Sequence, residues 1–215
     1  MSARIPPVEA PYSPEAAAVL RRMMPDGEEP LALFRLYARK VPLAEALHGW
    51  GSYELSRRLG LGLRDREMII DRTCARCGCE YEWGVHVARF ATRAGLTAAQ
   101  ISSLTHGSSA DPCWTTGRDR LLLDAADALH TRHDIDDALW ARLDTEFTPE
   151  ELLDLLMLCG WYHAISFTAR ATRLAQEPGT PRFREIPLPD GGSAEEDGRK
   201  VVLPASSSSS RPRQG

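Results

Sequence analysis

The sequence predicts an all-α protein, and three observations lead to this fold class. Apolar residues recur with a helical period along almost the whole chain, and helix start and stop signals flank the periodic segments. No segment alternates apolar and polar residues for long enough to propose a sheet. With 215 residues and 43% apolar content, the chain can bury the core of one ordinary domain.

Three helices are expected before residue 60. Ser13 followed by Pro14 is a typical helix start, because proline is favoured at the first helical position. The polar stretch from Asp26 to Pro30 then breaks the pattern, so we expect residues 1–29 to form an N-terminal helix and a linker. The three expected helical spans are 13–25, 31–39 and 42–59.

The next two helices are expected on either side of a group of cysteines. One begins near Leu63, and the other spans about 79–94. A single straight helix through both would hold position 67 about 18 Å from position 79. Gly78 is the expected break, and folding the chain back at this point brings Glu67 opposite His86.

Helices are expected to continue to the end of a domain that spans residues 30–176. Thr148-Pro-Glu-Glu151 is a capping box with proline at the first helical position, and Thr97 or Ser102 can cap shorter pieces. The longer expected spans are 116–131, 135–144 and 148–176.

The C-terminal segment differs in composition from the rest of the chain. From Glu177 onward, Pro, Gly, Ser and charged residues dominate, and five consecutive serines occur near the end. Such a segment cannot bury enough apolar surface to offset the entropy lost on ordering. We therefore predict that residues 177–215 form an extended tail that is disordered after about residue 190.

Composition excludes several classes of function. The net charge of −4, with interleaved basic and acidic residues, gives no basic stripe for nucleic acid. No apolar run approaches the roughly 20 residues of a membrane span, and the start of the chain has no signal-peptide pattern. Five cysteines, an odd number, indicate reduced thiols. We therefore expect a cytoplasmic protein whose partners are small molecules or other subunits.

Thirteen residues, Cys74 to His86, give the strongest indication of chemistry. They hold three of the five cysteines, two carboxylates beyond the last of these cysteines, and a histidine. At about 100° per residue, four side chains share one helical stripe. These four are Cys79, Glu82, Trp83 and His86. A carboxylate such as Glu67 that orients a histidine beside a thiol or an acid forms a proton relay.

Structural interpretations of the same residues stay open at this point. His86 can be an ordinary hydrogen-bonded histidine, and Trp83 can belong to the core whatever the function. Cys74 and Cys77 are consistent with small buried residues. Cys74-x2-Cys77 is half of a zinc motif, but no second C-x2-C or H-x3-H pair completes it, so no metal site is expected. Walker, dinucleotide-binding and G-x-S-x-G motifs are also missing.

The pattern Glu67-x11-Cys79-x2-Glu82-x3-His86 resembles the carboxymuconolactone decarboxylase and alkylhydroperoxidase D-like superfamily. The similarity extends over roughly residues 30–176. The resemblance implies an alkylhydroperoxidase D-like bundle of about six to eight helices and no obligatory organic cofactor. It also implies a homo-oligomer, which can be a dimer, a trimer or a hexamer.

Two activities occur in that superfamily. The peroxidase branch has a C-x2-C pair seven and four residues before the histidine, whereas this chain has Cys79 and Glu82 at those positions. The decarboxylase branch has a glutamate four residues before the histidine, as this chain does. Its Gly-x-Pro motif after the late tyrosine is missing here after Tyr162.

The resemblance thus implies a cofactor-independent enzyme that decarboxylates or isomerises a small carboxylated or enolisable compound. His86, held by Glu67, is expected to move the proton, with Glu82 or Cys79 as a second acid or base. The candidate pocket walls are Trp83, Phe34 and Trp50.

The sequence also leaves open which arginine binds a substrate carboxylate, and it allows two alternative functions. Arg64 or Arg66 is a candidate for binding a substrate carboxylate, although an arginine beside Glu67 can equally form an ion pair. The first alternative function is an alkylhydroperoxidase centred on Cys79, which requires a reactive thiol. The second is a non-catalytic oligomeric protein that uses the pocket only to bind a ligand.

Overall fold

The structure, a computed structural model, describes residues 2–25 and 27–189, and within them it consists of helices without strands. The all-α prediction is confirmed, with nine α-helices in the described part against the six to eight expected. They are α1 Pro14–Met23, α2 Ala32–Tyr37, α3 Val41–Glu54, α4 Leu63–Arg76, α5 Glu80–Phe90, α6 Ala98–His106, α7 Gly117–Arg132, α8 Asp137–Asp144 and α9 Pro149–Thr172.

Most helix starts follow from the local sequence. The side chains of Ser13, Thr97 and Thr148 each accept a hydrogen bond from a backbone N–H of the first turn, and the two threonines complete capping boxes. Thr97, rather than Ser102, therefore begins α6. Asp136 caps α8 in the same way, so that helix begins two residues later than residue 135, where we expected it.

Several helices end earlier than their apolar period predicts, and α3 and α9 show why. α3 ends at Glu54 instead of residue 59, because Leu59 and Leu61 are buried as anchors of a loop and not as a further helical turn. α9 ends at Thr172 instead of residue 176, because Arg173 adopts a left-handed conformation with φ of 54°. In both cases apolar residues reach the core without continuing the helix.

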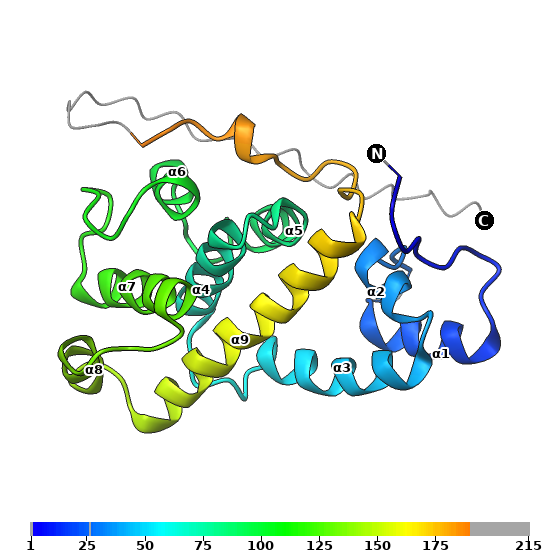
Figure 1. The fold of residues 1–215 in the computed structure, drawn as a ribbon, viewed down its shortest axis with the longest axis horizontal. Coiled ribbons are helices and arrows are strands. Elements are labelled where there is room, and N and C mark those ends of the chain that lie inside the picture. The colour runs from blue at the N-terminus through cyan, green and yellow to red at the C-terminus, as the bar shows by residue number, and fades with distance from the viewer. Residues whose placement is uncertain (1, 26, 190–215) are drawn as a thin grey trace, which may run out of the picture.

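The helices form two groups joined by α9. Figure 1 shows α1, α2 and α3 together at one side of the molecule, α6, α7 and α8 at the other, and α9 running between them. α4 lies at the centre, packed against α5, α6, α7 and α9. Ten consecutive residues of α4, Asp65 to Cys74, are buried, so its charged side chains need partners inside the protein.

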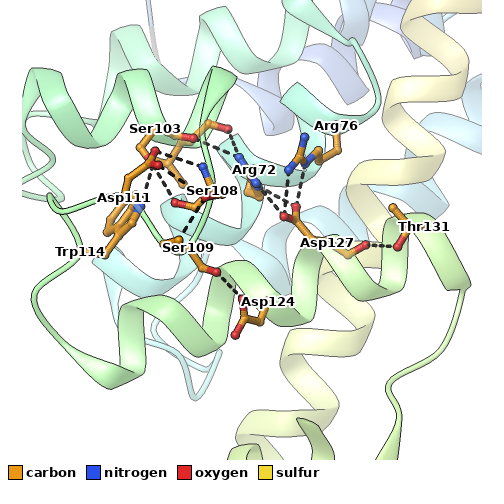
Figure 2. Close-up of polar contacts among 12 residues, drawn as sticks. Arg72, Arg76, Ser103, Ser108, Ser109, Asp111, Trp114, Asp124, Asp127 and Thr131 are labelled. Atoms are coloured by element: carbon orange, nitrogen blue, oxygen red, sulfur yellow. Dashed lines mark hydrogen bonds and ion pairs between the residues drawn. The ribbon is translucent and has the colours of Figure 1, made fainter. Parts of the chain in front are cut away.

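One such partner set lies between α4, α6 and α7 and is shown in Figure 2. The fully buried Arg72 forms two hydrogen bonds to the Asp127 carboxylate, at 2.7 and 2.6 Å, and donates to the carbonyls of Ser103 and Leu104 at 3.0 Å. Arg76 binds the same carboxylate from a more exposed position. This network ties three helices together at one end of α4.

α9 is the one described helix that is long and apolar enough to cross a membrane by length and composition alone. In the structure 56% of its most apolar window is buried, against α4, α5 and α8, as in the core helix of a globular domain. Leu153, Met157 and Phe167 are exposed on this helix.

The segment after α9 crosses α5, as Figure 1 shows. Glu177 accepts hydrogen bonds from the Tyr81 hydroxyl and the Ala32 backbone, and Glu80 accepts one from the backbone of Phe183. The described part of the predicted tail is therefore held against the domain. The disorder predicted after about residue 190 falls outside the described residues.

Candidate active site

The break between α4 and α5 brings the two helices into contact. Gly78 has a φ of 63°, a left-handed conformation that favours glycine, and Cys77 and Cys79 are the residues that end α4 and precede α5. The backbone N–H of Cys79 closes the turn by donating to the Cys74 carbonyl at 2.8 Å. This is the break that the sequence predicts.

Glu67 on α4 and His86 on α5 meet at the centre of this helix pair. The distance from Glu67 Oε2 to His86 Nδ1 is 2.8 Å, and the other nitrogen, Nε2, lies 3.0 Å from the Tyr162 hydroxyl of α9. Glu82 Oε1 lies 3.5 Å from the same Nε2. The histidine thus lies between two carboxylates and a phenol.

The charges around His86 favour its protonated form. Burial by itself lowers the pKa of His86, but the carboxylates of Glu67 and Glu82 outweigh it and raise the pKa to about 10. Burial likewise tends to raise the pKa of Glu67, and His86 together with Arg66 lowers it below its ordinary value. Arg66 Nε donates to Glu67 Oε1 at 2.8 Å. We therefore treat Glu67 as a carboxylate and His86 as an imidazolium near neutral pH.

A third carboxyl group lies one helical turn after Glu67. Asp71 is buried, and neither of its oxygens has a hydrogen-bond partner among the described residues. Burial and the neighbouring Glu67 raise the pKa of Asp71 well above its usual range, which favours the protonated acid. It therefore adds little negative charge beside the Glu67–His86 pair.

A cavity of about 470 Å³ opens onto one side of His86. Its polar end is formed by Glu82, His86 and Tyr162, and its walls are mainly apolar and aromatic. The apolar and aromatic wall residues include Leu33, Phe34, Tyr37, Phe90, Trp161 and Ile165. Arg22 and Arg89 also line it. The volume is in the range of small-molecule sites, about 300–1,000 Å³.

Of the three candidate pocket-wall residues, one lines the cavity and two pack elsewhere. Phe34 lines the cavity, whereas Trp50 and Trp83 are not among its lining residues. Trp50 packs behind Trp161, at 4.7 Å between ring centroids. Trp83 is fully buried and packs against Phe183 of the segment that crosses α5.

The two candidate carboxylate-binding arginines do not line the cavity either. Arg64 binds Asp119 and the Gly95 carbonyl, and Arg66 binds Glu67 and the Leu55 carbonyl. Both therefore act as ion-pair partners within the chain. The arginines at the cavity, Arg22 and Arg89, come from α1 and α5.

Cys79 is placed outside the cavity. It precedes α5, as expected, but its side chain is 1% exposed and does not line the cavity. Burial raises the pKa of the Cys79 thiol to about 11, and the nearby Glu82 backbone and Ser166 hydroxyl offset this only in part. Desolvation of the buried thiol thus outweighs the stabilisation that the start of a helix offers to a thiolate.

Tyr162 is the site residue that the sequence does not identify as such. It lies on α9, 76 residues after His86, and only the packing of α9 against α5 brings its hydroxyl to the histidine. A tyrosine in an apolar helix is ordinary, so no spacing rule distinguishes it. The pKa of its hydroxyl is raised by burial well above the ordinary value, which keeps it protonated.

Comparisons with known structures agree with this arrangement. An uncharacterized peroxidase-related protein from Silicibacter sp. TM1040 is similar with a TM-score of 0.69 and 18% identity, covering 82% of this chain and 92% of its own. A protein of unknown function from Agrobacterium tumefaciens, with a suggested role in antioxidant defence as AhpD, has a TM-score of 0.58 and 22% identity. That match covers 66% of this chain and 95% of the other. These likenesses show the fold.

The chain thus has an all-helical, alkylhydroperoxidase D-like fold, and this fold holds a buried glutamate–histidine pair. Residues 42–121 match the model of the carboxymuconolactone decarboxylase family, and this range includes Glu67, Cys79, Glu82 and His86. This match agrees with the superfamily resemblance seen in the sequence. No curated protein matches the chain.

Proposed function

We propose that this protein is a cofactor-independent enzyme that decarboxylates or isomerises a small carboxylated or enolisable compound. The observation that carries the proposal is the hydrogen-bonded set of Glu67, His86 and Tyr162 at the polar end of an otherwise apolar cavity. A positioned acid beside a reacting carbon is a common device for proton transfer, with contributions of about 10²–10⁴ in rate.

His86 acts as the acid in this proposal. As an imidazolium it donates Nδ1–H to Glu67 and Nε2–H to the Tyr162 oxygen, which leaves the Tyr162 hydroxyl proton free to point into the cavity. Tyr162 gives that proton to the substrate and is reprotonated by His86. Glu67 does not contact the cavity, so it is a positioning residue that holds the ring and stabilises its charge.

Glu82 supplies the complementary base. In an isomerisation, its carboxylate removes a proton from one substrate carbon, and the His86–Tyr162 pair delivers a proton to another. In a decarboxylation, the bond to the carboxylate breaks, CO₂ leaves with its oxygens, and the electron pair remains as an enolate. Tyr162 then protonates that carbon, and solvent restores the proton to His86.

Arg22 and Arg89 suit a substrate carboxylate better than the two arginines chosen from the sequence. Their present partners are Glu45 at 3.2 Å and Glu28 at 3.0 Å, and all four side chains are well exposed. Exposed ion pairs of this kind contribute only about 0–1 kcal/mol, so an arginine can exchange its partner for a substrate at little cost.

A thiol peroxidase centred on Cys79 is the weaker candidate. Its thiol is buried, is not part of the cavity wall, and has its pKa raised to about 11. The thiolate is the nucleophile in such chemistry, so this environment works against reaction with a hydroperoxide. Glu82 also occupies the position of the second cysteine of the peroxidase pattern.

The deciding experiment follows solvent deuterium into carboxylated lactones and related enolisable acids by NMR, together with CO₂ release. We expect wild type to show exchange or release with at least one compound and His86→Gln to lose about 100-fold or more of it. Arg132→Ala, on an exposed ion pair remote from the cavity, serves as the matched control. Binding without chemistry in wild type would instead favour the ligand-binding protein.

The competing activity is measured on the same preparations. Reduction of an organic hydroperoxide with a dithiol is compared between wild type and Cys79→Ser. We expect no reduction that depends on Cys79. Reduction that is lost in Cys79→Ser, with no deuterium exchange in wild type, would contradict the proposed function and establish the peroxidase.

We also propose that the chain forms a homo-oligomer through the exposed face of α9. Leu153, Met157 and Phe167 are 63%, 49% and 66% exposed, and large apolar side chains grouped on one helix are typical of subunit contacts. Light scattering should give a multimer for wild type and a smaller species for Phe167→Glu. A monomeric wild type would refute this assignment.

A further inference from the structure

Three metal-ligating side chains meet outside the cavity. Cys77 ends α4, His130 lies in the last turn of α7, and His163 lies on α9. Their Sγ, Nδ1 and Nε2 atoms all lie within 4.8 Å of one another. None of the three lines the cavity, so the cluster is separate from the proposed proton-transfer site.

A hydrogen bond of His163 to the backbone leaves its other ring nitrogen available as a metal ligand. Its Nδ1 lies 2.8 Å from the Cys159 carbonyl, which can only accept, so Nδ1 carries the proton and Nε2 carries a lone pair. That lone pair faces the cluster. A histidine that ligates a metal usually donates its other N–H to a carbonyl or a carboxylate, as His163 does here.

Two of the three distances between the donor atoms are close to those around one tetrahedral zinc ion, and the third, between Cys77 and His163, is within 4.8 Å. Bond lengths of 2.3 Å to sulfur and 2.0–2.1 Å to nitrogen place two nitrogens about 3.3 Å apart and a sulfur about 3.6 Å from a nitrogen. Here His130 Nδ1 lies 3.2 Å from His163 Nε2 and 3.8 Å from Cys77 Sγ. These two separations thus differ from the zinc geometry by only a few tenths of an ångström.

The cluster is partly accessible to solvent, so a water molecule can complete the coordination of a metal. Cys77 is buried, whereas both histidines are only partly buried, so solvent reaches one side of the cluster. The nearest arginine on α4, Arg76, is already paired with Asp127, which limits its repulsion of a cation. Without a metal, the rings of His130 and His163 can share a single N–H···N hydrogen bond at 3.2 Å. Metal-binding measurements distinguish this hydrogen-bonded state from a metal-bound state.

We propose that Cys77, His130 and His163 form a site for one zinc ion, with water in the fourth position. Three protein ligands plus water are typical of open zinc sites. The bound ion joins the ends of α4 and α7 to α9, beside the Arg76–Asp127 ion pair of α4 and α7 and the hydrogen bond that Arg170 of α9 donates to the Cys77 carbonyl. This differs from the expectation that the chain has no metal site.

Direct binding of Zn²⁺ to chelator-treated full-length protein tests the proposal. Calorimetry should give one ion per chain in wild type, and Co²⁺ in place of Zn²⁺ should show a thiolate-to-metal absorption band. We expect Cys77→Ser and His163→Gln each to weaken binding by more than about 100-fold, because loss of a supporting partner alone weakens metal sites by 10–100-fold. Loss of the thiolate band in Cys77→Ser then identifies the sulfur.

Matched controls separate this site from other thiols and imidazoles. Cys113→Ser and His106→Gln change a partly buried cysteine and an exposed histidine elsewhere, and both variants should bind Zn²⁺ as wild type does. Circular dichroism confirms folding, and His163→Gln decides the matter if Cys77→Ser fails to fold. Wild type that binds no Zn²⁺, or binding equal in wild type and His163→Gln, would overturn the proposal. Failure of the proposed enzyme activity leaves this result unaffected.

Discussion

Two polar networks lie along α4, and they differ in how completely their charges are satisfied. At one end, Arg72 is fully buried, and its donors meet the Asp127 carboxylate and two backbone carbonyls (Figure 2). Nearer the start of the helix, Glu67 and His86 are also buried, but Asp71 beside them has no hydrogen-bond partner among the described residues. We call the first network closed, because the donors of Arg72 have partners, and the second open, because the Asp71 carboxyl group has none among the described residues.

The difference separates a structural network from a candidate catalytic one. A buried charge whose partners are complete fixes helices in place but has no group left to offer a substrate. In the second network, His86 and Glu82 border a cavity, and the pKa of His86 is raised to about 10. Perturbed titration beside a cavity is typical of functional sites. Burial of charge alone therefore does not locate the active site on this helix.

Removal of the shared carboxylate in the closed network should have the largest effect. Asp127→Asn leaves the guanidinium of Arg72 fully buried without its counter-charge, and we expect a loss of about 3–5 kcal/mol in the free energy of unfolding. Arg76→Ala removes the more exposed arginine and should cost less than about 1 kcal/mol. Urea unfolding measures both. Equal losses would show that Arg72 does not depend on Asp127.

Glu67→Gln should disrupt the open network. Its effect should be smaller in energy and should appear in the rate and in the pH–rate profile. We expect kcat on an identified substrate to fall about 100-fold, which corresponds to about 2.7 kcal/mol in the barrier. Because Glu67 raises the pKa of His86, the limb of the pH–rate profile that reports His86 should also move to lower pH. An unchanged profile with reduced kcat would indicate a merely structural role for Glu67.

The pH dependence of stability should distinguish the two networks. The folded-state pKa of His86 is raised from 6.5 to about 10, so its contribution is fully present below about pH 6.5 and is lost as pH rises through about 10. The pKa values of Glu67 and Asp127 are lowered, so their contributions are lost as the solution becomes acidic. Chemical unfolding across pH should therefore show an alkaline decline that is reduced in His86→Gln. A decline of equal size in that variant would assign it to other groups.

The smallest effect is expected at the surface. Arg132, at the end of α7, and Asp136, which caps α8, form an exposed ion pair with 3.0 Å between the charged atoms. Arg132→Ala should change the free energy of unfolding by less than about 0.5 kcal/mol, because such pairs are screened and lose side-chain entropy. A loss above about 1 kcal/mol in the free energy of unfolding would show that burial does not explain why the two networks contribute more to stability than an exposed ion pair.

The sequence by itself determined the helices, their caps and the helix pair that holds the candidate site. These features depend on residues close together in the chain: Ser13 and Thr148 as caps, Gly78 as the left-handed break, and the spacing of Glu67, Glu82 and His86. Local geometry limits such choices strongly, so the Glu67–His86 pairing follows from one turn between two helices.

Tertiary structure decided which side chains reach the cavity and which are withdrawn from it. Packing of α9 brings Tyr162 to His86, whereas Trp83, on the same predicted stripe as His86, is covered by Phe183. The burial of Cys79, which raises the pKa of its thiol to about 11, is likewise a property of the packed structure. The same holds for Cys77, His130 and His163, which come from three helices. Desolvation and contact depend on all packed elements at once, and the spacing of residues in one segment does not contain that information.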